Sequence, residues 1–136
     1  MKAVFADAWF YVALIHERDA NHKRVVNFAE KNESILVTTR WVLAEVANAL
    51  SKAPTRAQAV ALLQTIECDP STRVVRSSDN LFESAQRLYE RRPDKEWSLT
   101  DCISFVVMEH EELREALTND HHFGQAGFVA VFADRS

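Results

Sequence analysis

The stretch Lys2-Ala-Val-Phe-Ala-Asp7-Ala-Trp-Phe-Tyr-Val-Ala-Leu-Ile15 joins a short apolar run that ends at an acid to a longer apolar run. Residues 2–7 have the length and composition of a buried strand, and residues 9–15 read as a helix. A strand followed directly by a helix is typical of the first unit of an α/β fold. An aspartate between two apolar runs is costly to bury unless it caps the helix or binds a cation. Asp7 is therefore the first candidate functional residue.

The same alternation continues along the rest of the chain. The expected strands are residues 35–38, 73–76, 116–118 and 129–132, and the expected helices begin at or near residues 9, 21, 39, 54, 79 and 98. Asn21 can cap the second of these helices, and Ser77-Ser78 is expected to cap the helix over residues 79–91. Strands separated by helices predict a mostly parallel central sheet with helices on both faces, which is a three-layer α/β/α fold. The sequence contains no internal repeat, linker or low-complexity tract, so we expect a single domain over residues 1–136.

Three more acids share the unusual setting of Asp7. Glu45 lies on the apolar side of its expected helix, and Asp120 follows the expected strand at 116–118. Asp101 is the last residue of the segment Ser98-Leu-Thr-Asp101, which has the capping-box pattern. That local role alone could explain both Ser98 and Asp101. A local explanation also exists for the others, because Asp7 and Asp120 can cap helices and Glu45 can face solvent.

Taken together, the four acids indicate a metal site. Carboxylates that lie close together raise one another's pKa and oppose assembly unless a hard divalent cation lies between them. Mg²⁺ is the natural occupant of such a site, and its chemistry suits water attack on a phosphodiester. We therefore expect a metal-dependent nuclease, with Asp7, Glu45, Asp101 and Asp120 as both metal ligands and catalytic residues.

The composition restricts the remaining classes. Hydrophobic residues make up 47% of the 136-residue chain and charged residues 26%, which is ordinary for a globular protein. No apolar stretch approaches the ~20 residues of a membrane span, and the N-terminus lacks a signal-peptide pattern, so a cytoplasmic protein is expected. Cys68 and Cys102 have no metal-ligand spacing and are expected to be buried free thiols. The net charge of −4 weakens the case for a nucleic-acid substrate. It does not exclude one, because the charges of four of the acids would be offset by the metal.

Three segments closely resemble the PIN-domain ribonucleases, particularly the bacterial toxins of the VapC type. Trp97-Ser-Leu-Thr-Asp-Cys-Ile-Ser-Phe105 resembles the segment that carries the third acid of that family. Ala116-Leu-Thr-Asn-Asp-His-His-Phe123, followed by Gln125-Ala-Gly-Phe128, resembles the segment of the fourth acid. Thr38-Thr-Arg-Trp-Val-Leu-Ala-Glu45 looks like the helix of the second acid. The resemblance spans nearly the whole chain.

The resemblance implies a PIN-like fold and an endoribonuclease that uses Mg²⁺, with Mn²⁺ as a substitute. It places the four acids of the family on Asp7, Glu45, Asp101 and Asp120, in that order. It also implies the toxin of a type II toxin–antitoxin pair, with RNA as substrate, a cognate antitoxin protein as partner, and a homodimer. One departure is that relatives often carry a small hydroxyl or amide residue just after the first acid. Here Ala8 and Trp9 follow Asp7, so one hydrogen bond near the metal site is expected to be missing.

Several alternatives stay open. A housekeeping RNA-processing nuclease and a non-enzymatic interaction module can both use the same fold. A zinc site at His110, His121 and His122 is disfavoured, because no Cys or His ligand spacing accompanies them. A Mg²⁺-dependent phosphatase would need a general acid two residues after its nucleophilic aspartate, where this chain has Trp9.

Overall fold

The computed structural model describes residues 2–134 and contains a five-stranded sheet in which every neighbouring pair of strands is parallel. The strand order is β3-β2-β1-β4-β5, so the first strand of the chain lies at the centre of the sheet. In chain order the elements are β1 (Ala3–Ala6), α1 (Ala8–Ile15), α2 (His22–Lys31), β2 (Ile35–Thr39), α3 (Arg40–Ala49), α4 (Thr55–Cys68), β3 (Thr72–Val75), α5 (Asp79–Arg91), α6 (Leu99–His110), β4 (Glu115–Leu117), α7 (His121–Gln125) and β5 (Val129–Ala130).

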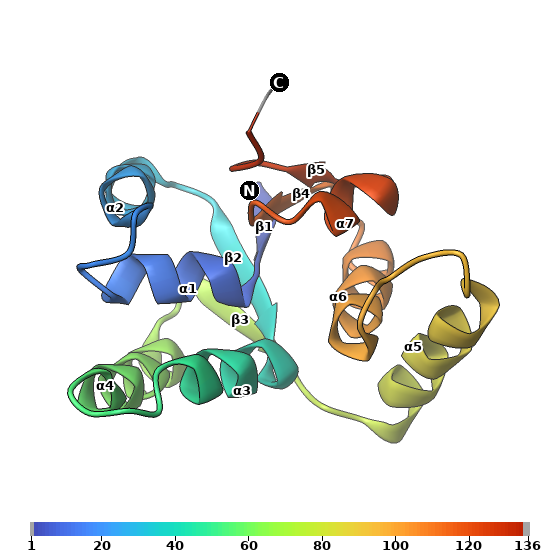
Figure 1. Ribbon diagram of the computed structural model, residues 1–136, viewed down its shortest axis with the longest axis horizontal. Coiled ribbons are helices and arrows are strands. Elements are labelled where there is room, and N and C mark those ends of the chain that lie inside the picture. The colour runs from blue at the N-terminus through green and yellow to red at the C-terminus, as the bar shows by residue number, and fades with distance from the viewer. Residues whose placement is uncertain (1, 135–136) are drawn as a thin grey trace.

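Helices cover both faces of this sheet. Figure 1 shows α1 and α2 on one side of the strands and α5 and α6 on the other. Val4, Phe5 and Ala6 of β1 are all buried, as is typical of a parallel strand that is covered on both faces. The core continues into Phe10 of α1 and Ile103 of α6. The α/β/α fold predicted from the alternation of strands and helices is confirmed.

Three helices begin at hydroxyl side chains, as their sequences predict. The hydroxyl oxygen of Thr39 accepts a hydrogen bond from the Val42 N–H at the start of α3, and that of Ser78 accepts one from the Leu81 N–H at the start of α5. Ser98 does the same at the start of α6. These caps satisfy N–H groups that have no partner within the helix, and so they fix where each helix begins. None of the helices in residues 2–134 combines the length and apolar composition that crossing a membrane requires.

Two local expectations are wrong. Cys102 is buried, but Cys68 is exposed, because the inward side of α4 carries Ala59 and Ile66 and the last residue of the helix points away from it. Asn21 precedes α2, yet its side chain makes no capping hydrogen bond.

The last strand is also shorter than expected, since β5 ends at Ala130 rather than at residue 132. Phe132 lies two residues beyond the strand, where its N–H still donates a hydrogen bond to the Thr118 carbonyl. Its ring packs against Trp9 of α1 and Phe28 of α2, with centroid distances of 5.1 and 5.4 Å. Arg24 lies over the same ring and donates a hydrogen bond to the Phe132 carbonyl. The Val131 N–H likewise donates to the Ala116 carbonyl, so the chain stays beside β4 while the aromatic ring packs against the helices.

Candidate active site

The two acids that follow strands are joined by a threonine. Because β1 pairs with β4, with Ala6 opposite Leu117, the residues after both strands meet at the carboxyl edge of the sheet. The Thr118 hydroxyl donates a hydrogen bond to Asp7 Oδ2 at 2.9 Å, and its oxygen accepts one from the Asp120 N–H at 3.2 Å. Thr118 is fully buried. It therefore fixes the first and fourth acids relative to each other, a role that the sequence analysis did not assign to it.

Asp7 occupies the residue before α1, and its side chain makes no capping hydrogen bond to the second or third residue of the helix, although the Ala8 N–H at the helix start lowers its pKa. Burial raises the pKa of Asp7 to about 6; the hydrogen bond from Thr118 lowers it, and the charges of Glu45 and Asp101 raise it. Ala8 and Trp9 contribute no side-chain hydrogen bond to Asp7, and the side-chain hydrogen bond that Asp7 does accept comes from Thr118, in the segment of the fourth acid. Trp9 instead packs on Phe132, away from any polar role at this edge.

Glu45 faces this edge from α3, which packs against α6. Burial raises the pKa of the Glu45 carboxyl, the neighbouring Thr100 side chain lowers it, and the charge of Asp101 raises it. Glu45 is therefore not a solvated surface charge. Its position follows from the Thr39 cap, which starts α3 directly after β2 and brings the helix to the same edge as Asp7.

Asp101 forms the capping box that its sequence predicts. Its carboxylate makes a further contact in addition to the capping box. Its Oδ2 accepts a hydrogen bond from the Ser98 N–H at 3.0 Å and lies 3.2 Å from His122 Nδ1. Within residues 2–134, no hydrogen bond reaches its other carboxylate oxygen. The side chain is 19% exposed, so the carboxylate is only partly shielded from solvent.

Asp120 caps the short helix α7 by accepting a hydrogen bond from the His122 N–H at 2.9 Å. Its Oδ1 also lies 3.4 Å from His122 Nδ1 and 3.7 Å from His121 Nδ1. Asp101 and Asp120 therefore share the His122 ring. The proximity of His122 to both acids was missed by the sequence analysis, because the two acids lie on different elements and nothing in their spacing indicates that they meet.

The four acids line one edge of the sheet without forming a closed cage. Asp7, Glu45 and Asp101 are close enough for their charges to raise pKa values, and His122 lies between Asp101 and Asp120. In the part of the chain that the structure describes, only Asp120, His121 and His122 place three ligand atoms within 4.8 Å of one another. His110, the third histidine of the zinc alternative, is not part of this group.

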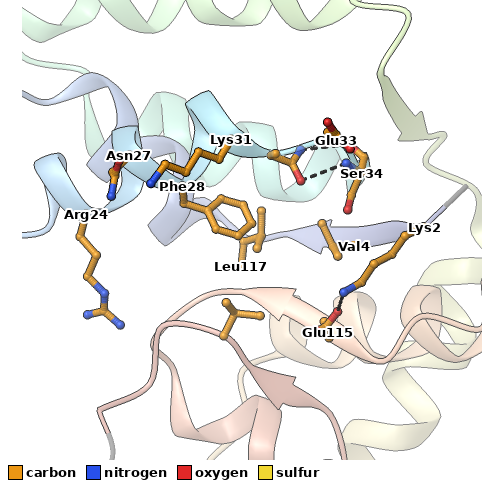
Figure 2. Close-up of a pocket in the computed structure, with 12 residues that line it drawn as sticks. Lys2, Val4, Arg24, Asn27, Phe28, Lys31, Glu33, Ser34, Glu115 and Leu117 are labelled. Atoms are coloured by element: carbon orange, nitrogen blue, oxygen red, sulfur yellow. Dashed lines mark hydrogen bonds and ion pairs between the residues drawn. The ribbon is translucent and has the colours of Figure 1, made fainter.

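The site also lacks the usual neutralising partners. Across residues 2–134, no lysine or arginine forms an ion pair with any of the four acids. Basic side chains instead lie at a separate cavity of about 440 Å³, shown in Figure 2, which Lys2, Arg24 and Lys31 line together with Glu115. None of the four acids lines that cavity. Oxygen donors that are close together and without cationic side chains fit a hard divalent cation.

Comparison with known proteins identifies relatives over nearly the full length. The family model described as "PIN domain" matches residues 4–129. Two relatives, both described as "23S rRNA-specific endonuclease VapC20" and found in Mycobacterium tuberculosis strains CDC 1551 / Oshkosh and ATCC 25618 / H37Rv, are 30% identical over 128 residues. Each match covers 94% of this chain and 97% of the relative.

Solved structures give the same result. The crystal structure of M. tuberculosis VapC20, described as a sarcin–ricin loop cleaving toxin, matches with a TM-score of 0.86 and 29% identity over 94% of this chain and 98% of that one. VapBC2 from Rickettsia felis, bound to a promoter DNA fragment, matches with a TM-score of 0.63 and 14% identity over 93% and 96% of the two chains. FitAcB from Neisseria gonorrhoeae has the same TM-score, with 18% identity over 95% and 96%. At these identities, the last two matches show a shared fold alone.

Proposed function

Because the chain belongs to the PIN-domain family, we propose that it is a metal-dependent endoribonuclease that hydrolyses RNA phosphodiester bonds at Asp7, Glu45, Asp101 and Asp120. The observation that carries this proposal is the gathering of Asp7, Glu45 and Asp101 at one edge, where burial and mutual charge hold the pKa of Asp7 at about 6. Such an arrangement is unfavourable in a protein that binds no cation, because each ionised carboxylate opposes the next.

The proposed metal is Mg²⁺, with Mn²⁺ as a substitute, and the four acids would hold it. When bound, a divalent cation supplies an acidified water and stabilises the charge that develops on the phosphodiester oxygens. The protein itself supplies orientation. Thr118 holds Asp7 Oδ2 and the Ser98 N–H holds Asp101 Oδ2, so both carboxylates are fixed in orientation. Fixed carboxylates need little rearrangement when a ligand arrives, which favours both binding and catalysis.

The similarity to VapC20 also suggests a biological role and a first substrate. VapC20 is described as specific for 23S rRNA and as a toxin that cleaves the sarcin–ricin loop. We therefore propose that this chain is the toxin of a type II toxin–antitoxin pair and that ribosomal RNA is its substrate class. A cognate antitoxin protein and a homodimer are proposed on the same basis, and co-purification from the native operon followed by light scattering would test both.

The decisive experiment is cleavage of labelled RNA by purified protein in Mg²⁺, in Mn²⁺ or with a chelator. The RNA should include a 23S fragment with the sarcin–ricin loop and an unstructured strand of equal length. Asp7→Asn and Asp101→Asn should abolish cleavage, whereas Asp134→Asn, at a side chain that is 99% exposed, should not change it. Absence of cleavage in every condition, with equal behaviour of all three variants, would favour the interaction module instead.

A further inference from the structure

We infer that Arg40 and Arg76 contact phosphate groups of the RNA strand on the side of the acid site where β2 and β3 end. This inference rests on the proposed function, because it takes RNA as the substrate. It goes further by naming two side chains that bind the substrate and the path along which the RNA leaves the acids. Both arginines bind phosphates other than the one that is cleaved.

The first observation is the place of the two arginines in the sheet. β1 and β2 pair in a register that, continued to their ends, places Asp7 opposite Thr39. β2 and β3 pair with Thr39 opposite Val75. Arg40 and Arg76 are the next residues after these two strands, so both begin at the carboxyl edge that carries the acids. Because neighbouring strands lie about 4.8 Å apart, the two arginines begin roughly 5 and 10 Å along this edge from Asp7.

The second observation is that neither guanidinium group is neutralised. Arg40 and Arg76 are both exposed, and within residues 2–134 neither side chain forms an ion pair or a hydrogen bond. Arg73, on the same strand that Arg76 follows, differs because it pairs with Glu111 at 2.9 Å. Two free positive charges at one place on a chain of net charge −4 attract a polyanion to that place.

The third observation is that both arginines line one cavity, of about 500 Å³, between α3, α4 and β3. Its lining includes the aliphatic side chains of Leu43 and Leu63 and one acid, Glu67. Across residues 2–134, Glu67 forms no ion pair with either arginine. Aliphatic surface supports the stems of arginine side chains while their charged ends stay in water. An anion that enters this space therefore meets both guanidinium groups.

Phosphate is the anion that fits this edge of the sheet. Lysine and arginine side chains make many of the contacts to nucleic-acid phosphates, and these contacts supply much of the binding affinity. The planar guanidinium group can hold two phosphate oxygens at once. Phosphates recur at short, regular intervals along a strand, so an RNA whose scissile phosphate lies at the acids carries further phosphates along the edge. Arg40 and Arg76 stand along that edge, one strand apart.

The basic cavity of Figure 2 does not offer the same groups. Lys2 pairs there with Glu115, and Arg24 donates a hydrogen bond to the Phe132 carbonyl. Among the described residues that line it, this leaves Lys31 as the cation without a recorded partner. The cavity also extends to the amino ends of β1 and β4, away from the acids. The carboxyl edge over β2 and β3 is therefore the better path for the substrate.

The test is RNA binding by the full chain in chelator, measured by fluorescence anisotropy. The probes are a labelled 23S fragment with the sarcin–ricin loop and an unstructured strand of equal length. Arg40→Gln and Arg76→Gln should each weaken binding of both RNAs about fivefold, because a phosphate contact carries no sequence information. The slope of log affinity against log salt should fall by about one in each variant. Arg114→Gln removes the same charge from an exposed residue at the amino end of β4, and should bind as the native protein does.

Cleavage kinetics in Mn²⁺ separate substrate binding from an effect on the acids. The two glutamine variants should show a raised KM with kcat within about twofold of native, because the contacts lie away from the reacting phosphate. Arg76→Lys keeps the charge and should recover most of the RNA affinity.

The remaining outcomes distinguish the two proposals. Equal RNA binding by Arg40→Gln, Arg76→Gln and Arg114→Gln would overturn the inference and leave the nuclease proposal intact. A fall in kcat at unchanged KM would overturn it too, since the arginines would then act on the acid site. Weaker RNA binding by the two variants, without cleavage by the native protein, would keep this inference and overturn the nuclease. If the native protein binds neither RNA, both proposals are wrong.

Discussion

Thr118 Oγ1 lies 2.9 Å from Asp7 Oδ2, although 111 positions separate the two residues in the chain. The bond crosses from β4 to β1 at the carboxyl edge of the sheet. It is made to a carboxylate that burial would otherwise leave poorly solvated, which explains why it lowers the pKa of Asp7. The first prediction concerns this bond.

Thr118→Val keeps the shape of the side chain and removes the hydroxyl. We expect RNA cleavage to fall about tenfold or more, because residues that orient metal ligands typically contribute that much. The measurement is the cleavage rate at saturating Mn²⁺ together with the thermal midpoint of unfolding. Thr65→Val, at an exposed threonine that bonds only the Ala61 carbonyl of its own helix, is the control. Equal cleavage rates for the two variants would show that Thr118 has no part in orienting Asp7.

The second prediction concerns pH. Asp7 has a folded-state pKa of about 6 against an ordinary value of 3.8, so folding favours its protonated form. Its contribution to stability is therefore greatest at low pH and is lost as the pH rises from about 4 to 6. Since one pKa unit corresponds to about 1.4 kcal/mol, metal-free Asp7→Asn should be up to roughly 3 kcal/mol more stable than the native chain at pH 7.

Urea unfolding in chelator between pH 4 and pH 8 measures this effect. The native chain should lose stability relative to Asp7→Asn as the pH rises, and Mn²⁺ should restore stability at pH 7 in the native chain alone. If the stabilities of the two proteins change with pH in parallel, then the pKa of Asp7 is not raised by folding and the prediction is wrong.

The third prediction separates the two roles of Asp101. Ser98→Ala removes the cap of α6 and should cost about 1 kcal/mol of unfolding free energy, while Mn²⁺ binding stays within about twofold of native. Asp101→Asn should lose metal binding as well. Ser78→Ala removes the equivalent cap of α5, at a distance from the acids, and provides a matched measure of the structural effect. Loss of Mn²⁺ binding in Ser98→Ala would mean that the capping box itself holds the site together.

The fourth prediction concerns the support beneath Asp120 and His122. The Phe123 ring is fully buried, with centroid distances of 5.0 Å to Phe105 and 6.3 Å to Phe5. Phe123→Ala should cost about 3–5 kcal/mol, measured by urea unfolding, because it leaves a cavity between α7 and the sheet. Val60→Ala, at a half-exposed residue of α4, should change stability by less than about 0.5 kcal/mol. A small effect at Phe123 would indicate that α7 docks independently of the core.

Much of the fold could be predicted because the signals are local. The apolar runs alternate regularly, and Ser78 marks the start of the helix at Asp79–Arg91, which forms with the expected bounds. The same locality explains the errors. Whether Cys68 faces inward depends on which side of α4 meets the sheet. The end of β5 depends on where Phe132 finds aromatic neighbours. Neither can be predicted from the residues that are adjacent in the sequence.

The site follows the same division. Each acid was singled out by an apolar or capping context, which is visible in the sequence. Thr118 and His122 were not, because their partners depend on β1 lying beside β4 and on α7 meeting the start of α6. These neighbours are set by tertiary packing. Residues that orient a site are therefore harder to find from sequence than the acids they orient.

β1 is the first strand in the sequence and lies at the centre of the sheet, where β4 is one of its two neighbours. The segment from residue 1 to residue 100 holds Asp7 and Glu45 but lacks Asp101, Thr118 and Asp120. It also lacks β4, so one edge of its central strand has no partner. The four acids of the proposed site are therefore divided between two distant parts of the sequence, and neither part alone can assemble the site.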